Sequence, residues 1–156
     1  MLELASALEE AAAKASAHIL PGFVRSIQTD AYSCGAHCAY AIMRYYGYTG
    51  SKRPVLKRLR NRDGLCWVEL REFFCECGLE PACIDKPTLR DLRREIDAGF
   101  PVMISVDTDH WATVYGYGKG CFYVMDSSLG RSVRCYHTTE RFRKRWDRWA
   151  MPIRAS

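Results

Sequence analysis

Three runs of β-branched and aromatic residues follow one another between residues 100 and 126, and turn sequences separate them. The runs are PVMISVD at 101–107, HWATVYGYG at 110–118 and CFYVMD at 121–126. Such runs, bounded by turn residues, predict β-strands. RSVRCYH at 131–137 is expected to be a fourth strand. The second half of the chain therefore predicts a sheet of antiparallel strands.

The first hundred residues carry helical patterns instead. An Ala-, Leu- and Glu-rich segment is stopped by Pro21-Gly22, a second apolar stripe stops at Gly47, and Thr88 is placed to cap a helix that ends before Gly99. Helices followed by strands favour an α+β domain, with the helices packed on the sheet. The predicted helices cover residues 1–20, 34–46, 54–60, 67–77 and 89–98.

The chain has 156 residues, which suits a single domain with one core. The richer pattern begins only at Phe23. We therefore expect a helical extension over residues 1–22 and one domain over residues 23–156.

The formal net charge is +5, and the excess lies mostly in the last quarter of the chain. A basic stretch of this kind can bind nucleic acid or an anionic membrane. No aromatic platform interleaved with glycines and no zinc-finger spacing accompanies it. We interpret it as the solvated face of a terminal helix, predict no nucleic-acid partner, and expect membrane association only through another protein. The basic residues are Arg131, Arg134, Arg141, Arg143, Lys144, Arg145 and Arg148.

Eight cysteines raise the question of disulfides and metals. No signal peptide is visible, and the first 20 residues are too polar to span a bilayer. We therefore expect a cytoplasmic protein whose thiols are reduced. No two cysteines have CxxC spacing, so a zinc site is not favoured, and the sequence implies no cofactor.

Two of these cysteines lie one helical turn apart in QTDAYSCGAHCAYAIMRYYG, at residues 28–47. A thiol becomes a good nucleophile near a helix N-terminus or an imidazolium, because both stabilise the thiolate. Cys34 lies where loop becomes helix, next to Gly35, which lets the backbone approach a substrate. Cys38 lies a turn deeper, within the apolar stripe. We predict that Cys34 reacts and that Cys38 packs.

A nucleophilic cysteine needs a histidine as its base. Among the four histidines, we favour His110, at the edge of a predicted strand. If residues 110–117 and 121–126 form a hairpin, His110 and Asp126 come close to opposite one another at its open end. An acidic residue there can hold the Nδ1–H of the imidazole and fix its tautomer. His37 is interpreted as a surface or packing residue.

Acyl transfer also needs donors aimed at the developing oxyanion, usually a side-chain amide and a backbone N–H. Gln28 precedes Cys34 by six residues, on the loop that leads into the helix. It is placed to supply that amide.

Together these segments resemble papain-like cysteine peptidases that process bacteriocin precursors, the double-glycine leader peptidases. The resemblance covers residues 23–153 and rests on the Gln28–Gly47 segment, LRDLRREIDAGFPVMISV, HWATVYGYGKGCFYVMDSSLG and RFRKRWDRWAMPI. Ser33 stands where the family often has aspartate, and Ser127 where it often has proline.

The resemblance implies a papain-like fold with Cys34 as nucleophile, His110 as general base and acid, Asp126 as its orienting partner, and Gln28 in the oxyanion hole. It also implies cleavage of a peptide precursor after small residues such as Gly-Gly, and a transporter as a candidate partner. Two alternatives stay open. The chain could bind a leader peptide without cutting it, or pass the acyl group to an amine, because transfer uses the same acyl-enzyme.

Overall fold

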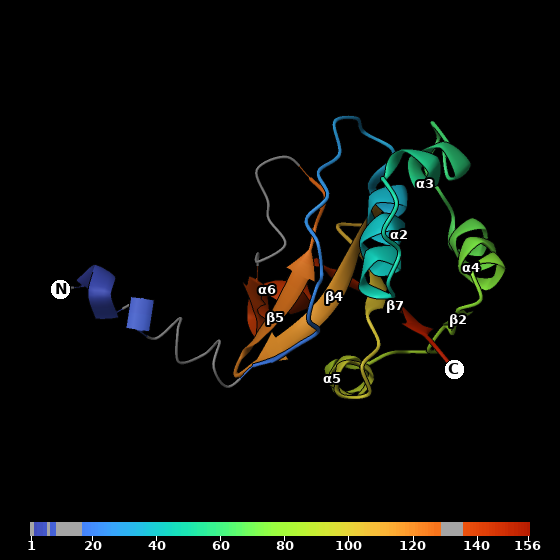
Figure 1. Cartoon of the computed structure of the whole chain (residues 1–156). Coiled ribbons are helices and arrows are strands. Elements are labelled where there is room, and N and C mark those ends of the chain that lie inside the picture. The colour runs from blue at the N-terminus through green and yellow to red at the C-terminus, as the bar shows by residue number, and fades with distance from the viewer. Residues whose placement is uncertain (1, 6, 9–16, 129–135) are drawn as a thin grey trace.

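An antiparallel sheet organises the part of the chain that the computed structural model describes, residues 2–5, 7–8, 17–128 and 136–156 (Figure 1). The strand order is β2-β7-β3-β4-β5-β6, and β1 pairs with β4 off this path. The predicted strands after residue 100 are confirmed as β3, β4 and β5. The fourth is confirmed at residues 136–137, and its residues 131–135 lie outside the described residues. The strands are β1 (His18–Ile19), β2 (Glu80–Pro81), β3 (Val102–Val106), β4 (His110–Gly118), β5 (Cys121–Met125), β6 (Tyr136–Thr138) and β7 (Trp146–Arg154).

Helices precede β3, as the sequence predicts, and a further helix follows β6 in the basic segment. Thr88 caps α5 as expected: its Oγ1 accepts the Asp91 N–H at 3.2 Å, and Asp91 Oδ2 accepts the Thr88 N–H at 2.7 Å. Within the described residues, no helix has the length and hydropathy needed to cross a bilayer. The helices are α2 (Cys34–Tyr45), α3 (Arg53–Arg58), α4 (Trp67–Glu76), α5 (Leu89–Asp97) and α6 (Thr139–Arg145).

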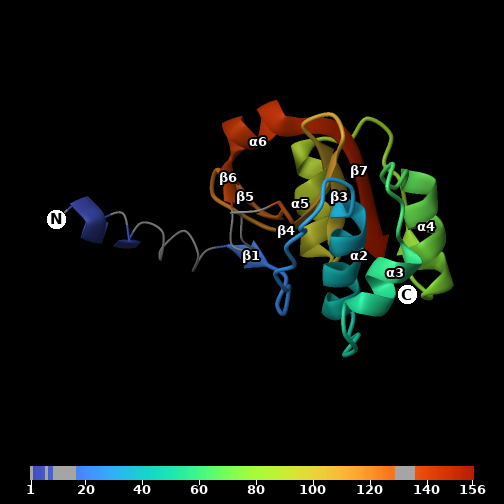
Figure 2. The same cartoon turned by 90° about the horizontal axis from the view of Figure 1, so that it is seen from above.

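Both faces of the sheet are buried, and α2 and α6 lie on opposite sides of it (Figure 2). Successive side chains of a strand point to opposite faces, so each strand serves two hydrophobic clusters. The expected α+β architecture is confirmed. The cluster beneath α2, α3 and α4 contains Met103, Tyr115, Tyr123, Met125 and Met151. The cluster beneath α5 and α6 contains Val102, Val114, Phe122, Val124 and Ala150.

The predicted helix over residues 1–20 is wrong at its end. Residues 2–5 and 7–8 are helical, but His18 and Ile19 form β1, which pairs with Tyr117 and Gly116 of β4. The pairing of β3 with β4 stops at Val114, so β1 supplies partners for the remaining backbone groups of β4. These tertiary hydrogen bonds override the local helical pattern.

A bulge interrupts the pairing of β7 with β3. Ile104 pairs with Ala150 and Val106 pairs with Trp146, so residues 147–149 lie opposite the single residue Ser105. A bulge of this kind bends a strand and re-aims its side chains. Here the side chains of Asp147, Arg148 and Trp149 need not alternate between the two faces of the sheet.

The segment before residue 23 contributes to the core through Leu20, which is 6% exposed and whose N–H donates to the Tyr115 carbonyl at 2.8 Å. We expect Leu20→Ala to lower the free energy of unfolding by about 2–4 kcal/mol, because it leaves a cavity beside the sheet. Leu8→Ala is the matched control, since Leu8 is 69% exposed. It should change stability by no more than about 0.5 kcal/mol in urea unfolding.

The boundary after residue 22 stays a prediction. Equal stability of the two variants would support an extension that is independent of the domain. A loss confined to Leu20→Ala would place the start of the domain before residue 20.

Candidate active site

Cys34 is the first residue of α2, the helix that lies against β4. Ser33, at the N-cap, makes no side-chain capping bond, and no acidic residue occupies the first turn. The positive end of the helix dipole favours negative charge at the first turn. The Asp30 carboxylate lies just before this turn and accepts the Ser33 N–H at 2.7 Å. The thiol is buried but lines a groove on the surface.

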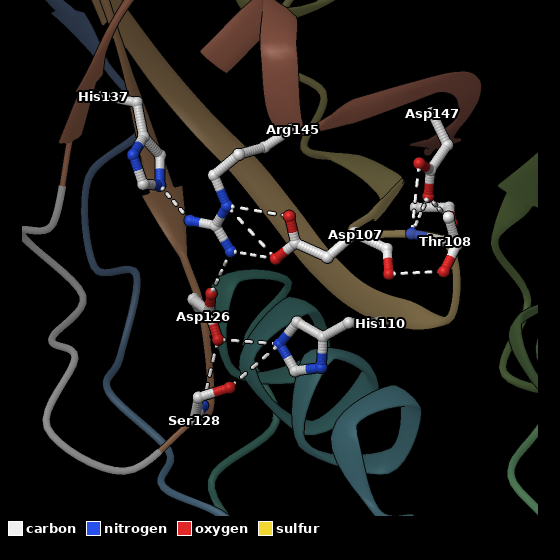
Figure 3. Close-up of polar contacts among 9 residues, drawn as sticks. Asp107, Thr108, His110, Asp126, Ser128, His137, Arg145 and Asp147 are labelled. Carbon is white, nitrogen blue, oxygen red and sulfur yellow. Dashed lines mark hydrogen bonds and ion pairs between the residues drawn. The ribbon is translucent and has the colours of Figure 1, made fainter. Parts of the chain in front are cut away.

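His110 and Asp126 meet at the open end of the β4–β5 hairpin, as the sequence predicts. Nε2 of His110 lies 2.7 Å from Oδ1 of Asp126 (Figure 3). The expected use of Nδ1 is wrong, because Nε2 is the nitrogen that faces the carboxylate. A register shift between Val114 and Gly116 brings Thr113 opposite Met125, so Asp126 follows directly after the last pair of the ladder.

The electrostatics of this pair favour an imidazolium next to a carboxylate. Burial lowers the pKa of His110, but hydrogen bonds with Asp126 and Cys34, together with their charges, outweigh burial and raise it to about 9. Burial raises the pKa of Asp126, but hydrogen bonds from His110 and from the Ser128 N–H bring it well below the usual range. The Asp126 carboxylate and the Cys34 thiol thus both stabilise the protonated His110 ring.

His37 and Cys38, which follow Cys34 in α2, are both buried. Cys38 is fully buried, and burial raises the pKa of its thiol, so it stays protonated at neutral pH. His37 is 3% exposed, and its Nδ1 lies 2.5 Å from Ser26 Oγ. Burial and the charge of Lys52 lower the pKa of His37. The packing interpretation of both residues is confirmed, with His37 inside the protein rather than on its surface.

Gln28 is anchored to the residue that follows Asp126. Its backbone N–H donates to the Ser127 carbonyl at 2.8 Å, and its Oε1 accepts from the Ser127 hydroxyl at 2.6 Å. Its Nε2 donates to the Asp30 carbonyl at 2.7 Å. A carbonyl can only accept, which fixes the orientation of the amide and leaves one N–H of Nε2 for another acceptor.

A groove of about 540 Å³ opens beside Cys34. The indole of Trp111 forms part of its wall, with Nε1 donating to the Leu65 carbonyl at 2.9 Å. A Cβ on Gly35 would lie 3.0 Å from the Trp111 ring, so Gly35 admits this side chain. Gly35 was expected to let the backbone approach a substrate. In the structure, Trp111 and Leu65 occupy the space beside Gly35. The lining includes Tyr32, Cys34, Arg62, Asp63, Leu65, Trp67, Thr108, Asp109, Trp111 and Trp149.

The groove walls and the contact of Arg145 with Asp126 were not predicted. Trp149 stacks edge-on against Trp111, with 5.0 Å between the ring centroids. Arg145 contacts the far oxygen of Asp126 at 3.5 Å. An aromatic residue directly after His110 was a usable signal for Trp111. Nothing local distinguished Arg145 from the basic residues around it.

The remaining histidines lie elsewhere. His18 stacks on Tyr117, and its Nδ1 lies 3.3 Å from Asp97. His137 Nε2 lies 3.0 Å from Arg145. Of the four histidines, His110 is the one that the structure brings to both Asp126 and Cys34.

A cysteine at the start of a helix that packs on an antiparallel sheet is the architecture of papain-like cysteine peptidases, and the predicted papain-like fold is confirmed. The sequence model of the protein family described as "Peptidase C39 family" matches residues 23–155. The chain belongs to this family. The resemblance to bacteriocin-processing peptidases is therefore confirmed, and no curated protein sequence matches.

Solved structures show the same fold at low sequence identity. The peptidase domain of Streptococcus ComA, a bi-functional ABC transporter involved in a quorum sensing pathway, has TM-score 0.73 and 20% identity, covering 86% of this chain and 99% of that one. A double glycine motif protease from an AMS/PCAT transporter, in complex with the leader peptide, has TM-score 0.71 and 18% identity, covering 88% and 97%. A putative C39-like peptidase from Bacillus anthracis has TM-score 0.62 and 14% identity, covering 88% and 98%.

The Ser127 hydroxyl is fully buried, and removing it leaves the buried Gln28 Oε1 without this donor. We expect Ser127→Ala to lower the free energy of unfolding by about 1–3 kcal/mol. In a double-mutant cycle with Gln28→Ala, the two changes should couple by about 1 kcal/mol, measured by urea unfolding. Strictly additive effects would show that the two side chains do not stabilise each other.

Proposed function

We propose that this cysteine peptidase uses Cys34 as nucleophile, His110 as general acid and base, and Asp126 to orient His110, and that it cleaves a peptide precursor after small residues such as Gly-Gly. The observation that carries the proposal is the position of His110, hydrogen-bonded to Asp126 at 2.7 Å and electrostatically coupled to Cys34. A thiolate beside an imidazolium at a helix N-terminus is an activated nucleophile.

In the first step, the Cys34 sulfur attacks the carbonyl carbon of the scissile bond, and the π electrons move to the oxygen. The tetrahedral intermediate collapses, the C–N bond breaks, and His110 gives its proton to the departing amine. In the second step, His110 takes a proton from water, which attacks the thioester and releases the acid and the thiolate. Asp126 stabilises the imidazolium before the amine departs, and again when His110 has taken the proton from water.

Gln28 is proposed to stabilise the oxyanion together with the backbone N–H of Cys34. Two contacts support this role: Ser127 and Asp30 fix the orientation of the Gln28 amide and leave one N–H of Nε2 for an acceptor. Donors that are held in place before the reaction cost no reorganisation when the negative charge develops.

The preference for small residues is supported by the bulky side chains that line the groove beside Cys34. Trp111 and Leu65 fill the space beside Gly35, and Trp149 closes on Trp111. A large side chain next to the scissile bond would compete with these groups for the same volume. One solved structure of this fold is a double glycine motif protease in complex with the leader peptide, and another is a domain of an ABC transporter. Both support a peptide precursor as substrate and a transporter as a candidate partner. Cytoplasmic location stays a prediction from the sequence, which shows no signal peptide.

Thiol labelling tests the assignment of Cys34 and His110. With iodoacetamide from pH 5 to 9 and mass mapping, Cys34 should be the thiol that reacts at low pH, because its thiolate is paired with the imidazolium. Cys38 should stay unlabelled, since it is fully buried. His110→Ala should abolish the reaction at low pH. The exposed cysteines 66, 75, 77 and 83 are internal controls. Equal labelling of several cysteines, with none below neutral pH, would contradict the assignment.

Cleavage of a synthetic precursor tests the substrate class. We expect cleavage after Gly-Gly, loss of cleavage in Cys34→Ala, and far slower cleavage when valine replaces the second glycine. Activity should fall as pH rises through about 9, because His110 then loses the proton that the leaving amine needs.

Two other outcomes would favour the alternatives. Stoichiometric binding without cleavage would indicate a leader-binding module. Preferential formation of an amide when a primary amine is added would indicate acyl transfer. Cleavage of the valine peptide at an unchanged rate would remove the small-residue preference.

A further inference from the structure

Arg145 differs from the other basic residues at the end of the chain. It is the last residue of α6, and its side chain is 20% exposed, whereas Arg141, Arg143 and Lys144 of the same helix are exposed. Its guanidinium points into the protein, toward the end of the sheet that carries His110 (Figure 3). The expectation of a solvated basic face therefore fails at this one position of α6.

The guanidinium contacts two carboxylates. Its Nη2 lies 2.5 Å from Asp107 Oδ2 and 3.5 Å from Asp126 Oδ2, and its Nε lies 3.1 Å from both oxygens of Asp107. The hydrogen bond and charge of Asp107, with the charge of Asp126, outweigh burial and raise the pKa of Arg145. The group stays positive and holds two like charges near one another, which would otherwise repel.

A third contact comes from His137, whose Nε2 lies 3.0 Å from Nη1 of Arg145. A guanidinium only donates, so Nε2 must be the accepting nitrogen of that ring. This contact limits the rotation of the guanidinium plane while it holds both carboxylates.

The contact with Asp126 concerns the carboxylate that faces His110. Oδ1 of Asp126 accepts from His110 at 2.7 Å and from the Ser128 N–H at 3.0 Å, and Oδ2 faces Arg145. The Asp126 side chain is 1% exposed, so water cannot readily replace a lost partner. Arg145 restrains the far oxygen of this carboxylate, and so helps to keep Oδ1 in the plane in which it meets the imidazole.

The contact with Asp107 concerns the turn that leads into β4. Asp107 and Thr108 have φ values of 52° and 74°, in the left-handed region that costs energy for residues with a side chain. The Asp107 N–H donates to the Arg145 carbonyl at 2.9 Å, and Asp147 accepts the Thr108 N–H at 3.0 Å. The end of α6 and the start of β7 thus hold the turn two residues before His110.

We propose that Arg145 is a positioning residue for the peptidase reaction: one guanidinium fixes both the Asp126 carboxylate and the Asp107 turn, and so sets the orientation of His110 toward Cys34. It is not among the residues that line the groove beside Cys34. The proposal rests on the roles of Cys34, His110 and Asp126 given above.

The test uses iodoacetamide alkylation of Cys34 in the full chain, which needs no peptide substrate. We expect Arg145→Gln to slow alkylation at pH 6 about tenfold, because a misoriented imidazolium pairs less well with the thiolate. At pH 10 the rate should stay within about twofold, because the thiolate then forms without the imidazolium. The matched control is Arg143→Gln, which removes the same charge from an exposed position of the same helix and should leave both rates unchanged.

A double mutant separates positioning from general stability. If Arg145 acts through Asp126, Arg145→Gln should slow alkylation little when Asp126→Ala is already present. Arg145→Lys is the second variant. It keeps the charge but not the fork of donors, and should give an intermediate rate at pH 6 with a melting temperature close to that of the wild type. It keeps the test decisive if Arg145→Gln fails to fold.

Three results would count against these ideas in different ways. If Asp126→Ala leaves the alkylation rate at pH 6 unchanged, the proposed role of Asp126 is wrong. If Asp126→Ala slows alkylation and both Arg145 variants react like the wild type, only the role of Arg145 is wrong. If Arg145→Gln slows alkylation equally with and without Asp126, its effect does not pass through that carboxylate, and the proposal is overturned.

Discussion

The antiparallel pairing of β4 with β5 sets the separation of the two polar residues at the open end of this hairpin. Pairing from Gly118↔Cys121 to Thr113↔Met125 carries the chain from a tight turn to His110 on one side and Asp126 on the other. The hairpin is held between β3, β1 and β6, and both of its faces are buried. Neither strand can slip by one residue without moving its side chains from one hydrophobic cluster into the other. The geometry of the candidate site therefore inherits the rigidity of the core.

The nucleophile reaches the hairpin because α2 packs against β4. Cys38 and Ala41 of this helix are fully buried in the same cluster as Met103 and Tyr115 of the sheet. The same packing places the uncapped start of α2 at the level of His110. Core packing and the chemistry of the thiol are thus properties of one contact between a helix and a strand.

Features with a local cause could be predicted from the sequence. The three strands after residue 100, the cap at Thr88 and the contact of His110 with Asp126 each follow from periodicity, turn residues or hairpin length. The separation of Cys34 from Cys38 follows from their places in one helix. The roles of Cys34, His110, Asp126 and Gln28 in catalysis stay predictions.

Other features depend on partners far away in the chain. Strand β1 forms because β4 extends beyond β3, which the alanine-rich pattern before it does not reveal. The nitrogen of His110 that meets Asp126 depends on the orientation of the imidazole ring, which no spacing encodes. Arg145 looks like its exposed neighbours until Asp107, from a turn 38 residues away in the chain, is brought beside it.

Two side chains of the bulge in β7 have different roles. Asp147 accepts hydrogen bonds from Ser105 and Thr108, while Trp149, two residues later, forms part of the groove wall. Because residues 147–149 lie outside the regular ladder, the pairs on either side, Ile104↔Ala150 and Val106↔Trp146, do not depend on their side chains. Residue 149 can therefore change during evolution, and the groove with it, while the pairing of β7 with β3 beside His110 stays in register. Substrate choice and catalytic geometry become separately adjustable within three consecutive residues.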